Sequence, residues 1–140
     1  MRVTPDTNTV VSGLLWHGSP RQVLDAAHDE KISLFTTATL LAELEEVLGR
    51  AKFTKQLAEA KVTAHNLVLD YAELATLVQP ADIPPTIHND PDDGEVLACA
   101  VAAQAKIIVS GDSHLLKLKQ FRDIEIMTAS ELLEKIPKDE

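Results

Sequence analysis

The chain has 140 residues, of which 45% are hydrophobic and 25% are charged, and its formal net charge is −9. This length suits one domain with a buried core, and the composition is that of a globular protein, not a disordered one. The excess of acidic residues excludes nucleic-acid binding through a broad basic face, and no apolar run reaches the roughly 18 residues of a membrane span.

We expect a cytoplasmic protein, because no basic segment followed by a long apolar one precedes the first strand signal. A single domain is expected over residues 1–136, followed by a polar tail over residues 137–140. The lone Cys99 excludes an internal disulfide, and we expect its small side chain to be buried.

Strand and helix signals alternate along the chain, which is the pattern of a parallel sheet covered by helices. The first half of the chain predicts, in order, a strand over residues 1–5, helices over 10–16 and 21–29, a strand over 32–35 and a helix over 39–49. The second half predicts one long or two short helices over 53–77, a proline-rich connection over 80–91, a helix ending at 104, a strand over 106–109, a helix over 113–118, a strand over 124–127 and a closing helix. Capping boxes are expected for two of these helices, one from Asp92 with Glu95 and one from Thr128 with Glu131.

Four acidic residues lie where apolar segments end or turn, namely Asp6, Glu43, Asp93 and Asp112. Each aspartate taken singly could cap a helix. However, Asp6 and Asp112 both follow predicted strands, and the carboxyl ends of parallel strands are where α/β sheets place their sites. We therefore expect these acids to converge, and gathered carboxylates favour a bound divalent cation.

Helical geometry restricts two of these positions further. The apolar stripe of the helix over 39–49 leaves Glu43 and Glu45 on its two opposite borders, so spacing alone does not choose between them. Asp93 lies on the same face as Leu97 and Ala100 in an almost wholly apolar helix, and we expect it to be drawn inward.

Three stretches of the sequence resemble the conserved blocks of a known family: DTNTVVSGLLW, TATLLAELEEVL and DPDDGEVLACAVAAQAKIIVSGDSHLL. They resemble PIN-domain proteins, specifically the bacterial toxin components of toxin–antitoxin systems. The resemblance implies a three-layer α/β/α sandwich with a central, mostly parallel sheet of about four to five strands. It also implies a metal-dependent ribonuclease similar to VapC-type toxins, which would use one or two Mg²⁺ or Mn²⁺ ions, cleave RNA, bind an antitoxin protein and form a homodimer.

The resemblance assigns roles residue by residue. The four family acids fall on Asp6, Glu43, Asp93 and Asp112. Asp6, Asp93 and Asp112 would be metal ligands, and Glu43 would be a ligand or a base that positions water.

Four further residues belong to the matched blocks. Asn8 and Ser110 would orient ligands or water from a surrounding shell. Asp90 and Asp92 would replace or assist the third acid.

The sequence departs from the family at Thr4-Pro5, where a hydrophobic residue usually precedes the first aspartate. Because proline has no N–H to donate to a central strand, we expect the strand to end early or to carry a bulge. Either distortion would displace Asp6 and weaken metal binding.

Two alternatives remain open from the sequence. Asp6 with Gly111-Asp112 partly resembles haloacid dehalogenase-type phosphatases, although that family has a second aspartate where Asn8 stands. The second alternative is an interaction module of the same fold, whose acidic pocket docks a basic segment of a partner. If the substrate is a nucleic acid, metal ions and a local basic cluster must attract it, and the candidates are Arg50, Lys52 and Lys55, or Lys117, Lys119 and Arg122.

Overall fold

The computed structural model describes the backbone of residues 1–84 and 91–137, and the side chains of the same residues except 91 and 92. Its strands are β1 (Arg2–Pro5), β2 (Ser33–Thr36), β3 (Thr76–Leu77), β4 (Ile107–Val109), β5 (Gln120–Phe121) and β6 (Ile124–Met127). Its helices are α1 (Thr7–Leu15), α2 (Ser19–His28), α3 (Ala38–Leu48), the 3₁₀ turn η1 (Ala51–Phe53), α4 (Thr54–Ala60), α5 (Ala64–Leu74), α6 (Pro91–Ala102), α7 (Ser113–Leu118) and α8 (Ala129–Lys135). None of the helices in these described ranges is long and apolar enough to cross a membrane.

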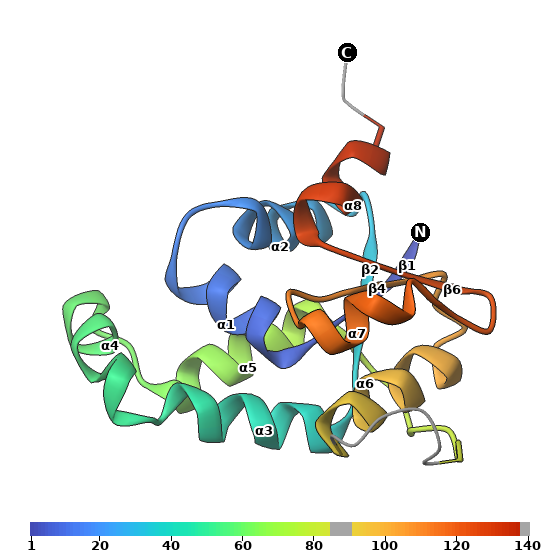
Figure 1. Ribbon diagram of the computed structural model, residues 1–140. Helices are drawn as coiled ribbons and strands as arrows, with labels where there is room; N and C mark the ends of the chain where they lie inside the picture. The colour runs from blue at the N-terminus through green and yellow to red at the C-terminus, as the bar shows by residue number, and fades with distance from the viewer. Residues whose placement is uncertain (85–90, 138–140) are drawn as a thin grey trace.

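The strands form one sheet in the order β3-β2-β1-β4-β6-β5. Figure 1 labels the four inner strands of this sheet, β2, β1, β4 and β6. Every neighbouring pair is parallel except β5 with β6. The expected mostly parallel α/β sheet is confirmed, with six strands in the described chain instead of four to five. The two additional strands, β3 and β5, have two residues each, which is too short for any alternation to predict them.

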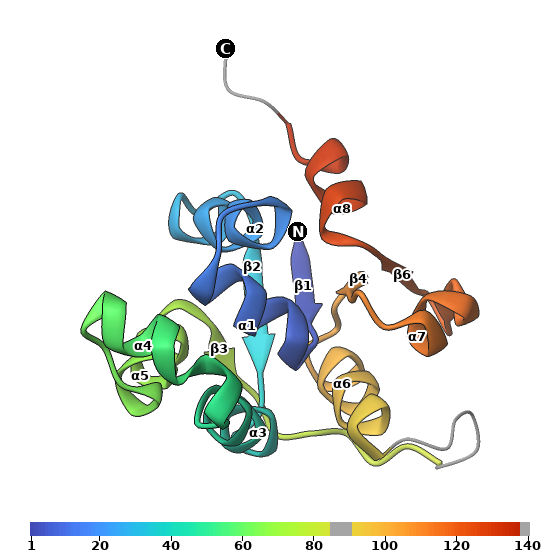
Figure 2. The same ribbon diagram turned by 60° about the vertical axis from the view of Figure 1, so that its left-hand side comes forward.

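Helices cover both faces of the sheet (Figure 2). Val3 and Val109 belong to one apolar cluster, with residues of α1, α2, α3, α5 and α8. Ile108 belongs to a second cluster, with residues of α6 and α7. Since successive side chains of a strand point to opposite faces, the apolar β4 places residues in both clusters, which is typical of a buried parallel strand. The molecule therefore has two apolar cores separated by the sheet.

Several helix boundaries differ from those expected. The helix predicted over residues 10–16 begins at Thr7, because Asp6 caps it by accepting a hydrogen bond from the Thr9 N–H at 2.9 Å. The segment predicted as one long or two short helices forms α4 and α5, separated at Lys61, which has a φ of 59°. The capping box of Thr128 and Glu131 is confirmed at the start of α8.

The capping box expected from Asp92 and Glu95 is wrong. Helix α6 begins at Pro91, so Asp92 lies inside its first turn and not at its cap. Proline favours the first helical position, because its missing N–H would have no partner within the helix. The helix also ends at Ala102, two residues before the expected end, and Gln104 beyond it has a left-handed φ of 54°.

The expectation that Pro5 shortens or bulges the first strand is wrong. Residues of β1 pair one to one with β4 as far as Pro5 with Val109, and the next N–H, that of Asp6, donates to the Val109 carbonyl at 2.9 Å. Because the peptide groups of a strand point to its two neighbours in alternation, the missing N–H of Pro5 faces β2. The registered pairs between β1 and β2 end at Val3 with Leu34. Proline therefore removes no hydrogen bond to β4, and Asp6 lies directly at the end of the strand.

Cys99 is fully buried, as expected. Burial, with a smaller contribution from the charge of Glu95, raises the pKa of its thiol to about 11, although a hydrogen bond with Thr4 acts in the opposite direction. The thiol is therefore a protonated, apolar core group near neutral pH.

The buried face of α6 should be sensitive to loss of side-chain volume. Leu97 is 0% exposed, so Leu97→Ala should lower the free energy of unfolding by about 2–5 kcal/mol, through lost burial and the cavity left behind. The matched control is Leu69→Ala on α5, where the side chain is 49% exposed and the change should be within about 0.5 kcal/mol. Urea unfolding measures both values, and equal effects of the two substitutions would contradict this packing.

Candidate metal-binding site

A cavity of about 500 Å³ lies beside the carboxyl ends of β1 and β4. It receives side chains from α1, α3, α6 and the turn between β4 and α7. Its lining residues are Asp6, Thr7, Asn8, Thr39, Ala42, Glu43, Glu46, Val47, Arg50, Asp93, Val96 and Asp112. All four predicted acids are among them, so the structure brings together residues that are up to 106 positions apart in the sequence.

Asp6 is buried, with 6% of its surface exposed, and both of its carboxylate oxygens accept hydrogen bonds. The Thr9 N–H donates to Oδ1 at 2.9 Å, and the Ser110 hydroxyl donates to Oδ2 at 2.5 Å. These bonds replace the hydration that a charged carboxylate loses on burial. A carboxylate has about four lone-pair sites, so two hydrogen bonds leave capacity for a further ligand.

Ser110 joins two of the predicted acids. Ser110 is only 1% exposed. Its hydroxyl donates a hydrogen bond to Asp6 and accepts one from the Asp112 N–H at 2.9 Å. This one hydroxyl therefore fixes the end of β4 against the end of β1.

Asp112 is half-buried and caps α7. Its Oδ1 accepts a hydrogen bond from the His114 N–H at 2.7 Å. The His114 ring is largely exposed, and its Nδ1 lies 3.6 Å from the same carboxylate oxygen. Capping restricts the Asp112 side chain to the edge of the cavity.

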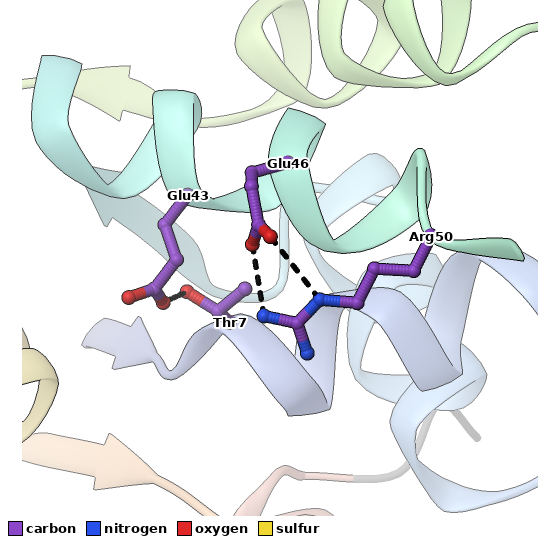
Figure 3. A network of polar contacts seen from close by, with 4 residues as sticks. All are labelled: Thr7, Glu43, Glu46 and Arg50. Atoms are coloured by element: carbon purple, nitrogen blue, oxygen red, sulfur yellow. Dashed lines mark hydrogen bonds and ion pairs between the residues drawn. The ribbon is translucent and has the colours of Figure 1, made fainter. Parts of the chain in front are cut away.

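The structure distinguishes Glu43 from Glu45, which spacing alone did not. Glu43 lines the cavity and accepts a hydrogen bond from the Thr7 hydroxyl of α1 (Figure 3). Glu45 is exposed and contacts the His65 ring instead, with 2.9 Å between Oε1 and Nδ1. The sequence did not single out Thr7 as a partner of α3, because that contact depends on how the two helices pack.

Asp93 is 4% exposed and lines the same cavity, on a helix whose Leu97 and Ala100 are fully buried. Its expected inward position is therefore confirmed. Asp90 and the side chain of Asp92, the two residues that would replace or assist it, lie outside the described residues.

Glu46 and Arg50 form an ion pair along one side of the cavity. The guanidinium donates to both carboxylate oxygens, from Nη2 at 2.9 Å and from Nε at 3.3 Å. In Figure 3 the carboxylates of Glu43 and Glu46 both point from α3 toward α1. In the sequence, Arg50 stands out only as part of a basic stretch, although its spacing of four residues from Glu46 is that of a helical ion pair.

The lining residues fit a divalent cation by their chemistry. Five carboxylates and one guanidinium line the cavity, and carboxylate oxygen is the donor that Mg²⁺ and Mn²⁺ prefer. Within the described residues, no three histidine, cysteine, aspartate or glutamate side chains already lie close enough to hold an ion. Binding would therefore require the carboxylates to move closer together than they lie in this structure.

A family model described as PIN domain matches residues 2–114. An uncharacterised protein of Methanocaldococcus jannaschii is 26% identical over 120 residues, which cover 85% of this chain and 76% of that protein. The structure of the T. brucei RRP44 PIN domain is similar with a TM-score of 0.47 and 14% identity, over 95% of this chain and 79% of that one.

The hydrogen bond from Ser110 to Asp6 should contribute measurably to stability. Ser110→Ala removes one of the two donors to a buried carboxylate, so we expect a loss of about 1–3 kcal/mol in the free energy of unfolding. Ser113→Ala, at an exposed position three residues away, is the matched control and should cost less than about 0.5 kcal/mol. Urea unfolding at neutral pH compares them, and a Ser110→Ala protein as stable as the control would contradict the role given to this bond.

Proposed function

Because the chain belongs to the PIN-domain family, whose members are generally nucleases that use divalent metal ions, we propose that it is a Mg²⁺- or Mn²⁺-dependent endoribonuclease. It would hydrolyse RNA phosphodiester bonds as the toxin of a toxin–antitoxin pair. The observation that carries the proposal is the convergence of Asp6, Glu43, Asp93 and Asp112 on one cavity.

The burial and the contacts of the four acids suggest different roles for them. Asp6, Asp93 and Asp112 are the proposed metal ligands, since the first two are almost wholly buried and the third is fixed beside Asp6 through Ser110. A bound divalent ion would supply a Lewis acid that activates water and neutralises charge developing on the phosphodiester. Glu43 is half-buried and held by Thr7, and it is the proposed ligand or water-positioning base.

The charge distribution also bears on the substrate. The chain carries −9 overall, yet Arg50 lies on the cavity itself, and Lys52 and Lys55 follow it as exposed residues. A phosphate of the substrate could replace Glu46 as the partner of the Arg50 guanidinium, because that pair is exposed and contributes little stability. The second basic group, Lys117, Lys119 and Arg122, is not among the residues that line this cavity.

A docking role remains the second candidate, and the ion pair between Glu46 and Arg50 favours it. The Arg50 guanidinium already pairs with Glu46 in the cavity, so an arginine or lysine of a partner, such as an antitoxin, would pair with the cavity carboxylates in the same way. Such a segment would inhibit the nuclease, because it would occupy the carboxylates that are proposed to bind the metal ion.

Homodimerisation is a further expectation from the family resemblance. The phosphatase alternative is set aside, because the PIN-domain match spans both of the motifs on which it relied.

Metal-dependent cleavage tests the proposed activity. Purified protein should cleave a mixed, structured RNA with Mg²⁺ or Mn²⁺ and should not do so with EDTA. Asp6→Asn and Asp112→Asn should each lower the rate by at least about 100-fold, since even the partners that surround metal ligands are worth 10–100-fold. Asp123→Asn, a matched change at an exposed turn residue, should leave the rate unchanged.

Two outcomes would contradict the proposal. Cleavage that persists in EDTA would exclude a metal mechanism. Equal activity of Asp6→Asn and Asp123→Asn would exclude the cavity as the site. Binding of a basic peptide without any cleavage, even with bound metal, would favour the docking role.

A further inference from the structure

A second cavity of about 440 Å³ adjoins the acidic one. It lies between α1, the first turns of α2 and α8, and the turn that follows β4. Its lining residues are Asn8, Thr9, Ser12, Ser19, Pro20, Ser110, Gly111, Asp112, Thr128, Ala129 and Ser130. Asn8 and Asp112 line both cavities, so the two cavities are neighbours that share these residues as a common wall.

The chemistry of the second cavity differs from that of the first. Asp112 is the only charged residue among the described residues that line this cavity. The other lining groups are six hydroxyl side chains, one amide, and backbone and small apolar groups. A phosphate is disfavoured there, because the described part of the lining offers a carboxylate and no lysine or arginine. Stacking of a base on an aromatic side chain is also excluded there, because none of the described residues that line this cavity is aromatic.

Several of these polar side chains have hydrogen-bonding capacity to offer. Ser110 already bonds to Asp6, and Thr128 already bonds to Glu131 in its capping box. In contrast, the side chains of Asn8, Ser12, Ser19 and Ser130 make no hydrogen bond to the described part of the chain. Each hydroxyl can donate and accept, and the asparagine amide can do both through separate atoms.

We propose that this second cavity binds one nucleoside of the RNA, its base together with its ribose, directly beside the phosphate that is cleaved. The inference rests on the proposed nuclease function, because it takes the acidic cavity as the place of cleavage. The volume is within the range of roughly 300–1,000 Å³ of small-molecule sites. A neutral, polar ligand with a flat apolar face matches hydroxyl and amide groups beside Pro20 and Ala129.

A nucleoside bound in this cavity would make cleavage selective for one base. Stacking tolerates every base, whereas hydrogen bonds to base edges distinguish one base from another. Since the described lining offers hydroxyl and amide groups and no aromatic ring, recognition there should select a base at one position next to the cleaved bond.

The first test measures nucleoside binding without cleavage. Backbone amide signals of the ¹⁵N-labelled full chain are followed by NMR during titration with adenosine, guanosine, cytidine or uridine in EDTA. We expect saturable shifts at Ser12, Ser19 and Ser130, with affinities that differ among the four nucleosides. Inorganic phosphate should produce no saturable shift at these residues.

Two variants fill the cavity with apolar volume. Ser12→Leu with Ser130→Leu should abolish the saturable shifts, and Ser130→Leu alone, at an exposed position, should weaken binding by about tenfold or more, which corresponds to roughly 1.4 kcal/mol. Ser33→Leu is the matched control, because Ser33 is exposed on β2 and does not line this cavity, and it should bind nucleosides as the unaltered chain does.

The second test uses the cleaved ends of a randomised RNA pool. The unaltered chain and Ser33→Leu should show one preferred base at a position flanking the cut, and Ser130→Leu should lose that preference. Cleavage without any base preference, together with no nucleoside shift, would overturn the inference while leaving the nuclease proposal intact. Nucleoside shifts at this cavity in a protein that cleaves no RNA would support the binding site and count against the nuclease proposal. Saturable shifts with inorganic phosphate instead of nucleosides would also overturn the inference.

Discussion

The buried carboxylate of Asp6 and its two hydrogen bonds are the interaction on which the arrangement of the site depends. A charged group with 6% exposure is tolerated only where donors replace water, and here the donors come from Thr9 on α1 and Ser110 after β4. One carboxylate thereby caps a helix and joins the ends of two adjacent parallel strands. Loss of the Ser110 hydroxyl would leave one oxygen of this buried carboxylate without its hydrogen-bond donor.

The remaining acids reach the same place through different elements. Glu43 comes from α3 and is held by Thr7 of α1, whereas Asp93 comes from α6 on the other face of the sheet. The sheet order puts β1 beside β4, so the two helices that follow these strands begin next to each other. The acidic cavity and the hydroxyl-lined cavity share Asn8 and Asp112, so a cavity lined by five carboxylates lies beside one lined mostly by hydroxyl groups.

The sequence predicted the parts of this site that depend on strand ends and missed those that depend on packing. The convergence of Asp6 and Asp112 followed from their positions after strands and is confirmed, while their role in binding metal stays a prediction. Glu43 and Glu45 were equivalent in a helical projection, and only the contact with Thr7 separates them. The error at Pro5 arose because the rule on proline in central strands does not say which neighbour its nitrogen faces. The hydroxyl-lined cavity had no signature, since common small residues from four separate segments form it.

Anomalous diffraction from crystals of the full chain soaked in Mn²⁺ would measure directly whether these carboxylates hold a divalent ion. We expect an anomalous peak in the acidic cavity, with carboxylate oxygens of Asp6, Asp93 and Asp112 at coordination distance. We also expect the peak to disappear in Asp6→Asn crystals. A cavity without any peak at saturating Mn²⁺, or a peak bound only by exposed acids elsewhere on the surface, would contradict the account.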